Sequence, residues 1–146
     1  MENHPSCIFC QIVKGKAPAS IVFQDENITA FMDTQPLFQG HTLIVPNYHF
    51  TGLTDLDDRY GTLMFITGRR VAKAILQSSL HCEGVNLFLA HGAAANQSVF
   101  HSHLHVIPRY PGDGFQIQHP SGYGDHPSRR ELDEAAEQIR LNLRED

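Results

Sequence analysis

Three histidines, His101, His103 and His105, alternate within five residues of the chain. Successive side chains of a strand point to opposite faces, so these three imidazoles would share one face. Three adjacent imidazoles make a poor core, because each ring has two nitrogens to satisfy and protonation would bring like charges together. A neutral imidazole is a good nucleophile near pH 7, and a second one beside it can carry a proton to a leaving group. The spacing therefore predicts a functional row.

The residues before this row supply hydrogen-bond donors. The small, turn-prone stretch 93–98 lets backbone N–H groups approach an anion, and within it Gln97 and Ser98 add side-chain donors. A nucleophile, a proton shuttle and donors for an oxyanion together are typical of transfer at phosphorus. A metalloenzyme is the rival interpretation, because His101 and His103 have a spacing with which two rings on one strand bind zinc. That interpretation leaves the donors of the loop without a role.

The three cysteines are the second group with chemical potential. Cys7 and Cys10 form a C-x-x-C pair, and Cys82 stands alone. In a cytosolic chain an odd, sparse set favours metal binding or redox chemistry over a disulfide framework. Two ligands do not complete a structural zinc site, which needs four, and the pair has the alternative of being reduced, buried thiols. A thioredoxin-like role lacks the expected βαβ surroundings. We expect Cys82 to be a packing residue.

Composition limits the class of protein. The chain has 146 residues, 41% of them hydrophobic and 18% charged, which fits one globular domain or two small ones. A formal charge of −5 argues against a nucleic-acid surface. No apolar run approaches the roughly 20 residues that span a bilayer, so we expect no membrane partner. The segment 1–5 has no signal-peptide character, which indicates a cytoplasmic protein.

Periodicity and turn residues divide the chain into elements. Ser6 is placed to cap a short first helix, and Gly15 follows its end. Period-two segments predict strands, and apolar residues three and four apart predict helices. Strands that neighbour one another in the sequence, with helices between or after them, are typical of an α+β fold with an antiparallel sheet. The predicted helices span 7–13, 55–79 and 129–143, and the predicted strands span 19–24, 28–33, 41–46, 85–90 and 98–109.

The stretch 97–109, QSVFHSHLHVIPR, resembles the signature of the histidine triad (HIT) nucleotide hydrolases and transferases. The similarity extends through 7–10, 30–33, 40–46 and His49, and in all covers about residues 7–109. It implies a HIT-like fold, which is a five-stranded antiparallel sheet with a long helix, a short N-terminal helix and a C-terminal helix. We therefore expect a single HIT domain over 1–146, with 110–146 as a C-terminal extension.

The resemblance implies a covalent nucleotidyl-histidine mechanism. His103 matches the histidine that attacks the α-phosphate, while His105 and Ser98 match residues that contact the phosphate and the leaving group. Gln97 matches a glutamine that reaches the scissile region. The implied substrate is a small nucleoside 5'-monophosphate derivative, an AMP-type phosphoramidate or phosphoanhydride. No redox cofactor or divalent-ion cluster is implied.

The resemblance also implies how the nucleoside is bound. Asp33 matches an aspartate that binds ribose hydroxyls, and a carboxylate suits this task because it accepts two hydrogen bonds. The base pocket is apolar in the family, and Ile8, Phe9, Phe31 and Thr34 fall at its positions.

A structural zinc ion and a homodimer follow from the same resemblance. The matching zinc ligands are Cys7, Cys10, His49 and His101, a closed set that leaves no position for water. Dimerisation in the family pairs the long helix and one strand across a two-fold axis, so we expect a homodimer.

The chain departs from the family at three positions. Ala90 replaces a common asparagine, Asn96 replaces a usual glycine, and Ser102 stands where an apolar residue is commoner. Asparagine tolerates positive φ, so we expect Asn96 to keep the turn and to belong to the substrate-binding set. Two alternatives therefore stay open, a dinucleoside polyphosphate hydrolase and a catalytically weak nucleotide- or zinc-binding module. Spacing does not say whether His41 and His91 approach the site.

Overall fold

The computed structural model describes residues 4–143. Residues 1–3 lie outside the described residues. They belong to the segment 1–5, for which the sequence predicts no signal-peptide character. The chain forms two compact units that meet in sequence between Asp113 and Gly114. The first unit contains the motif-bearing part of the chain, and the single domain expected over 1–146 stays a prediction.

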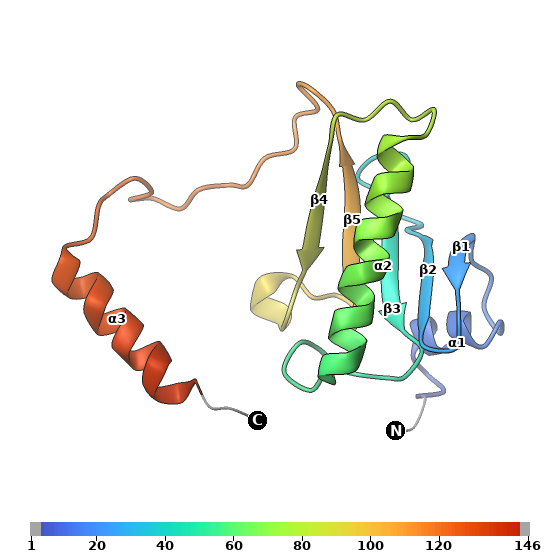
Figure 1. Ribbon diagram of the computed structural model, residues 1–146, viewed down its shortest axis with the longest axis horizontal. Helices are drawn as coiled ribbons and strands as arrows, with labels where there is room; N and C mark the ends of the chain where they lie inside the picture. The colour runs from blue at the N-terminus through green and yellow to red at the C-terminus, as the bar shows by residue number, and fades with distance from the viewer. Residues whose placement is uncertain (1–3, 144–146) are drawn as a thin grey trace. The chain divides into compact units, whose positions relative to one another are not determined.

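The first unit is built on a five-stranded antiparallel sheet in the order β1-β2-β3-β5-β4 (Figure 1). The α+β prediction is therefore confirmed. A single turn of 3-10 helix, η1, interrupts the loop between β4 and β5. The elements are α1 (Ile8–Val13), β1 (Ile21–Gln24), β2 (Ile28–Met32), β3 (Thr42–Pro46), α2 (Asp58–Leu76), β4 (Gly84–Leu89), η1 (Ala93–Ala95), β5 (Leu104–Arg109) and α3 (Arg129–Asn142).

The two faces of this sheet pack against different helices. One face, which includes Ile28, Ala30 and Ile44, packs against α2 in the main core. The alternate residues Phe31, Leu43 and Val45 form a second, smaller core with Phe9 of α1. This is the period-two alternation of a strand, and in the central strands β2 and β3 both faces are buried. Because His105 pairs with Leu43, its side chain lies on the α1 face.

Hydrogen bonds at the helix ends explain where the two helices of this unit begin. The side chain of Asp57 accepts the N–H of Arg59 and caps α2, whereas Asp55 accepts the N–H groups of Thr51 and Gly52 in the preceding loop. The helix predicted over 55–79 therefore starts three residues later. At α1 the predicted Ser6 cap is wrong.

Cys7 is the N-cap residue of α1, and it makes no side-chain capping bond. Its N–H donates to the carbonyl of His4, which folds the chain into a turn immediately before the helix. Gly15 follows the end of α1 with φ of +66°, as its position in the sequence predicted.

The last strand is shorter than the predicted 98–109, because β5 begins at Leu104. Its neighbour β4 ends at Leu89, which pairs with Leu104, so residues 98–103 have no strand beside them in the ladder. The N–H of Ser102 donates instead to the carbonyl of Phe50. Phe100, expected on the face opposite the histidines, is 49% exposed outside the sheet.

The second unit contains α3, which starts with a full capping box. Ser128 accepts the N–H of Glu131, and the Glu131 carboxylate accepts the N–H of Ser128. None of the residues Arg129–Asn142 is buried. Within residues 4–143, no helix is long and apolar enough to cross a membrane.

Candidate active site and metal centre

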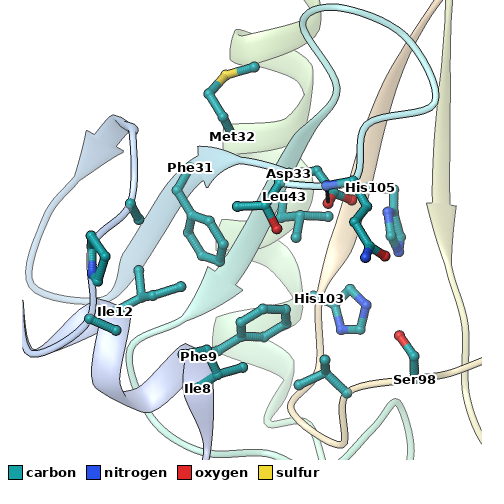
Figure 2. A pocket seen from close by; sticks show the side chains of 16 residues that line it. Ile8, Phe9, Ile12, Phe31, Met32, Asp33, Leu43, Ser98, His103 and His105 are labelled. Carbon is teal, nitrogen blue, oxygen red and sulfur yellow. Dashed lines mark hydrogen bonds between the residues drawn. The ribbon is translucent and has the colours of Figure 1, made fainter.

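A cavity of about 460 Å³ opens between α1, the end of β2 and the segment that leads into β5 (Figure 2). Its volume is in the range of small-molecule sites. Its walls combine an apolar side with a polar end, as ligand sites usually do. Eight of the predicted site residues line it: Ile8, Phe9, Phe31, Asp33, Thr34, Ser98, His103 and His105.

The apolar side of the cavity comes from α1 and β2. Phe9 and Phe31 meet edge to face with their ring centroids 5.4 Å apart, and both are buried. Ile8, one residue before Phe9, is 46% exposed at the rim. Two fixed rings and an exposed aliphatic side chain form a surface that can take a planar, apolar group such as a nucleobase.

His103 lies at the polar end with its tautomer fixed by the backbone. Its Nδ1 is 2.7 Å from the carbonyl oxygen of His101, which can only accept, so Nδ1 carries the proton. The lone pair is therefore on Nε2. Burial lowers the pKa of His103, which keeps the ring neutral at pH 7. A neutral, oriented imidazole with a free Nε2 has the properties of a nucleophile.

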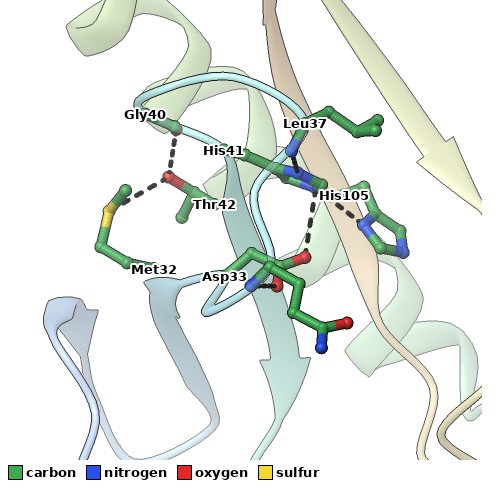
Figure 3. Close-up of polar contacts among 8 residues, drawn as sticks. Met32, Asp33, Leu37, Gly40, His41, Thr42 and His105 are labelled. Atoms are coloured by element: carbon green, nitrogen blue, oxygen red, sulfur yellow. Dashed lines mark hydrogen bonds and ion pairs between the residues drawn. The ribbon is translucent and has the colours of Figure 1, made fainter.

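His105 is held by His41 in a chain of hydrogen bonds (Figure 3). The N–H of Leu37 donates to Nδ1 of His41 at 3.1 Å, so the proton of neutral His41 is on Nε2. That Nε2 is 2.9 Å from Nδ1 of His105 and donates to it. His105 is thereby left with its own proton on Nε2, as a donor in the cavity wall. Burial, then the nearby His103 and His41, lower the pKa of His105 to about 4.

Asp33 closes this polar end from the β2 side. Its Oδ1 accepts the N–H of Gln35 at 2.8 Å, and its Oδ2 lies 3.6 Å from Nε2 of His41. The carboxylate lines the cavity and keeps acceptor capacity for a ligand.

Two predicted residues lie outside the cavity wall. Asn96 ends the 3-10 turn at φ of +63°, so the turn expected at this position is kept. The Gln97 side chain is buried in the loop, where Oε1 accepts the N–H of Gly92 and Nε2 donates to the carbonyls of Thr51 and Val99. The Gln97 amide thus ties this loop to the one before α2. Their predicted contacts with substrate stay predictions.

His91 makes a second tie between the same two loops. Its Nδ1 accepts the N–H of Leu53 at 3.0 Å, and its ring fills the space where a Cβ of Gly52 would lie. Ser98 follows directly from this fixed loop. The histidine that approaches the reacting groups is therefore His41, and His91 has a structural place.

A second cluster lies beside the cavity, where Cys7, Cys10, His49 and His101 each offer one atom within 4.8 Å of the others. Nε2 of His101 donates to the carbonyl of Pro46 at 2.9 Å, so its Nδ1 lone pair faces the thiols. The sulfur–nitrogen distances are 3.3 Å to His49 and 3.5 Å to His101. Tetrahedral zinc with Cys and His ligands needs about 3.5 Å along such an edge. The donor set fits zinc.

Protonation and metal binding compete in this cluster. Burial, and next the neighbouring Cys7, raise the pKa of the Cys10 thiol to about 11. Burial lowers the pKa of His101 to about 4 and also lowers that of His49. The imidazoles are therefore ready ligands, while a metal has to displace the thiol protons.

His41 is the functional candidate that the sequence did not identify. His41 and Leu43 are two residues apart and so face the same side, and Leu43 pairs with His105. The proximity of His41 to His105 can be inferred only once the register between β3 and β5 is known, and the sequence alone does not determine that register.

A family model for the HIT domain matches residues 14–112. An uncharacterized HIT-like protein of Borreliella burgdorferi is 40% identical over 111 residues, which are 75% of this chain and 79% of that protein. The adenylylsulfatase HINT3 of Arabidopsis thaliana is 34% identical over 107 residues, 73% of this chain and 54% of that protein.

Solved structures show the same similarity. A HIT family protein from Bacillus anthracis superposes with a TM-score of 0.86 at 33% identity, over 96% of this chain and 99% of that one. A Zn-bound histidine triad family protein from Mycobacterium smegmatis gives 0.74 at 39% identity, over 94% and 98%. A histidine triad nucleotide-binding protein from Candida albicans gives 0.82 at 27% identity, over 94% and 97%.

Proposed function

The chain belongs to the HIT domain family, and from that premise we propose that it hydrolyses or transfers nucleoside 5'-monophosphate groups. The bond cleaved is a phosphoramidate or a phosphoanhydride, and AMP is the nucleotide expected first. Relatives named as an adenylylsulfatase and as a nucleotide-binding protein support this reaction class. The observation that carries the proposal is His103, a neutral imidazole whose Nδ1–H is held by a carbonyl and whose cavity is of nucleotide size.

The nucleoside half of the substrate fits the cavity from its apolar side. The base lies against Phe9 and Phe31, with Ile8 and Thr34 at the edge. The Asp33 carboxylate accepts hydrogen bonds from the two ribose hydroxyls. This places the α-phosphate at the polar end, beside His103.

The first chemical step forms one bond and breaks one. The Nε2 lone pair of His103 attacks the α-phosphorus, and the bond from phosphorus to the leaving nitrogen or oxygen breaks with its electron pair on the leaving atom. The Nε2–H of His105 donates a hydrogen bond to that atom, and the proton that neutralises the leaving group comes from solvent, so His105 stays a neutral imidazole. Ser98 and backbone N–H groups of its loop donate to the phosphate oxygens.

The second step restores the enzyme. Water attacks the phosphorus and gives its proton to solvent, and the phosphorus–nitrogen bond to His103 breaks with its electron pair returning to Nε2. His41 acts through His105, because its Nε2–H keeps the His105 proton on the nitrogen in the cavity. His41 is thus a positioning residue.

We assign structural zinc to Cys7, Cys10, His49 and His101, as the Zn-bound relative supports. With four protein ligands, no coordination position is left for water or substrate. The metal would tether α1, which carries the base-binding Phe9, to the segment that carries His103.

A homodimer and a cytoplasmic location complete the proposal. At the β4 edge of the described sheet, Leu87 and Phe88 are 37% and 50% exposed, and Leu53, which lines a hollow together with Leu89 of β4, is 55% exposed. An open edge with exposed apolar side chains is a suitable surface for a second copy. Light scattering of a Phe88→Asp variant tests this, since a dimer through β4 predicts a monomer of half the mass.

Intact mass spectrometry tests the reaction. Wild type and His103→Ala are incubated briefly with adenosine 5'-phosphoramidate and quenched without acid, because a phosphohistidine bond is acid-labile. We expect an adduct of one AMP on wild type and none on the variant. AMP release without an adduct calls for rapid quench, since a fast second step hides the intermediate. Neither adduct nor AMP would contradict the proposal and favour a binding module.

A further inference from the structure

An exposed histidine, His4, lies beside the four zinc ligands assigned above and is not one of them. Its ring packs against the His49 ring with the centroids 4.5 Å apart and the planes tilted by 54°. Its carbonyl accepts the N–H of Cys7 at 3.0 Å, so the turn that begins at His4 leads directly to the first cysteine ligand. A neutral imidazole has one nitrogen lone pair, and ring packing leaves that lone pair unused.

The four ligands differ in how open they are to an ion from outside. His101 and Cys10 are 0% and 2% exposed, whereas Cys7 and His49 are half-buried. Both half-buried ligands line one hollow of about 360 Å³, and His4 lines it as well. An ion that enters through this hollow therefore meets the three accessible side chains before it meets the two buried ligands.

A smaller hollow, of about 150 Å³, is lined by the buried ligand Cys10. Lys14 and Lys16 line it too, and their ammonium groups repel a divalent cation. Among the described residues that line the larger hollow there is no Lys or Arg. Imidazole and thiol groups, the ligand types that zinc prefers, line it instead. Charge and ligand type therefore both favour the larger hollow as the path of the ion.

A closed tetrahedral site needs help to exchange its ion, because all four positions are held by the protein. Zinc can expand its shell from four ligands to five, so a free ligand beside the site lowers the barrier to exchange. His4 has the properties of such a ligand, since its ring is in contact with that of His49 and is exposed to solvent.

From these contacts we infer that His4 is an entry ligand for zinc, which binds the ion in the larger hollow and passes it to His49 and Cys7. The bond from His4 to the ion breaks as the cluster ligands bind, and each thiol that binds releases its proton to solvent. Departure follows the same steps in reverse. His4 therefore changes the rate of exchange and not the amount of zinc held. This inference rests on the zinc site of the proposed function and goes beyond it.

The experiment measures how fast the zinc-loaded protein exchanges its ion for an excess of a stable zinc isotope. Desalted samples are analysed by plasma mass spectrometry, which gives the isotope ratio and the zinc content together. Wild type is compared with His4→Ala and His4→Phe, because phenylalanine keeps a ring against His49 but has no lone pair. Ser6→Ala is the matched control, since Ser6 is also exposed and lines the same hollow.

We expect both variants of His4 to exchange zinc roughly tenfold more slowly than wild type, an effect of the size found for residues just outside the ligand set. The zinc content should stay at one ion per chain. His4→Cys should recover much of the rate, because a thiolate is also a zinc ligand. Ser6→Ala should exchange at the rate of wild type.

Four results would overturn the inference. Slow exchange in His4→Ala but not in His4→Phe would make His4 a packing support for His49, and wild-type rates in both would show that the ion enters without His4. Faster exchange in His4→Ala than in wild type would make the ring a barrier. A lower zinc content in both variants would make His4 a resident ligand. Failure of the zinc site itself is distinguishable, because wild type would then hold no zinc.

Discussion

Two clusters each gather metal-ligand atoms within 4.8 Å of one another: Cys7, Cys10, His49 and His101 in one, and Asp33, His41 and His105 in the other. They differ in whether the lone pair of a histidine ring is free for a metal or already accepts a hydrogen bond. In the first cluster, His101 donates its only N–H to a carbonyl, which leaves its lone pair toward the thiols. In the second, the lone pair of His41 already accepts the N–H of Leu37. A metal on Nε2 of His41 would force the proton onto Nδ1, against that N–H.

The difference assigns the two clusters to different tasks. Residue types and proximity alone would allow a metal in both, but the hydrogen bonds around each ring decide the tautomer and so the chemistry. We therefore assign Cys7 and Cys10 with their two histidines to a metal site, and His41 with His105 to a hydrogen-bond relay. His103, between the two, keeps its Nε2 free of both.

Loss of the thiols should have the largest effect. The double variant Cys7→Ala, Cys10→Ala should retain less than a tenth of the zinc and unfold at least 10 °C lower, because metal binding free energy contributes to folding. Plasma emission spectrometry and calorimetry measure the two effects. The residual folded enzyme should keep a kcat within about fivefold of wild type, since no step passes through the metal. A loss of turnover as complete as that of His103→Ala would break the comparison.

Truncation of His41, the outer histidine of the relay, should lower kcat and leave the bound zinc in place. His41→Ala should lower kcat by about 10- to 100-fold, a smaller loss than removal of a group that itself transfers a proton, because His41 acts through His105; zinc content should be unchanged. His41→Gln should recover part of the rate, because its amide can still donate to Nδ1 of His105. If His41→Ala lost zinc while keeping kcat, the two assignments would be reversed.

How much of this arrangement the sequence predicts depends on whether local pattern or pairing decides it. The hairpin strands, the long helix and the residues of the cavity wall follow from period, turn residues and the family resemblance. The start of β5 does not, because Leu89 ends the neighbouring strand and only the ladder shows it. The role of His41 cannot be predicted without the register between β3 and β5. The hydrogen bond from Gln97 to the carbonyl of Thr51 cannot be predicted without knowing how the two loops run.

The contribution of His105 to the pH dependence of the free energy of unfolding should be a smaller effect than those of the two preceding variants. The folded pKa of His105 is about 4 against an ordinary 6.5, so between these values the unfolded chain binds a proton that the folded chain does not. Stability therefore falls as pH falls through this window and is unaffected above it. Because the ring is partly exposed, wild type should lose about 1 kcal/mol more than His105→Gln between pH 7 and pH 5. Urea titrations at both pH values measure the difference, and equal losses would contradict a His105 that stays neutral in the folded protein.

The smallest effect is expected between the two clusters, at Ser102. Among the described residues, its hydroxyl is the one buried side-chain polar atom without a hydrogen bond. Ser102→Ala should raise the free energy of unfolding by about 1 kcal/mol and leave zinc content and kcat unchanged. Thr42→Val is the matched control, because the equally buried Thr42 hydroxyl donates to the carbonyl of Gly40 and its removal should destabilise. A destabilised Ser102→Ala variant would mean that its hydroxyl is paired after all.

Zinc X-ray absorption spectroscopy tests the contrast between the clusters most directly. The protein is loaded with two equivalents of zinc, passed over a desalting column, and examined beside the Cys7→Ala, Cys10→Ala variant. We predict one zinc per chain, with a shell of two sulfurs at about 2.3 Å and two nitrogens at about 2.0 Å, and no retained zinc in the variant. A second zinc with only nitrogen and oxygen ligands, retained by the variant and lost in His41→Ala, would contradict the assignment of His41 and His105 to a hydrogen-bond relay.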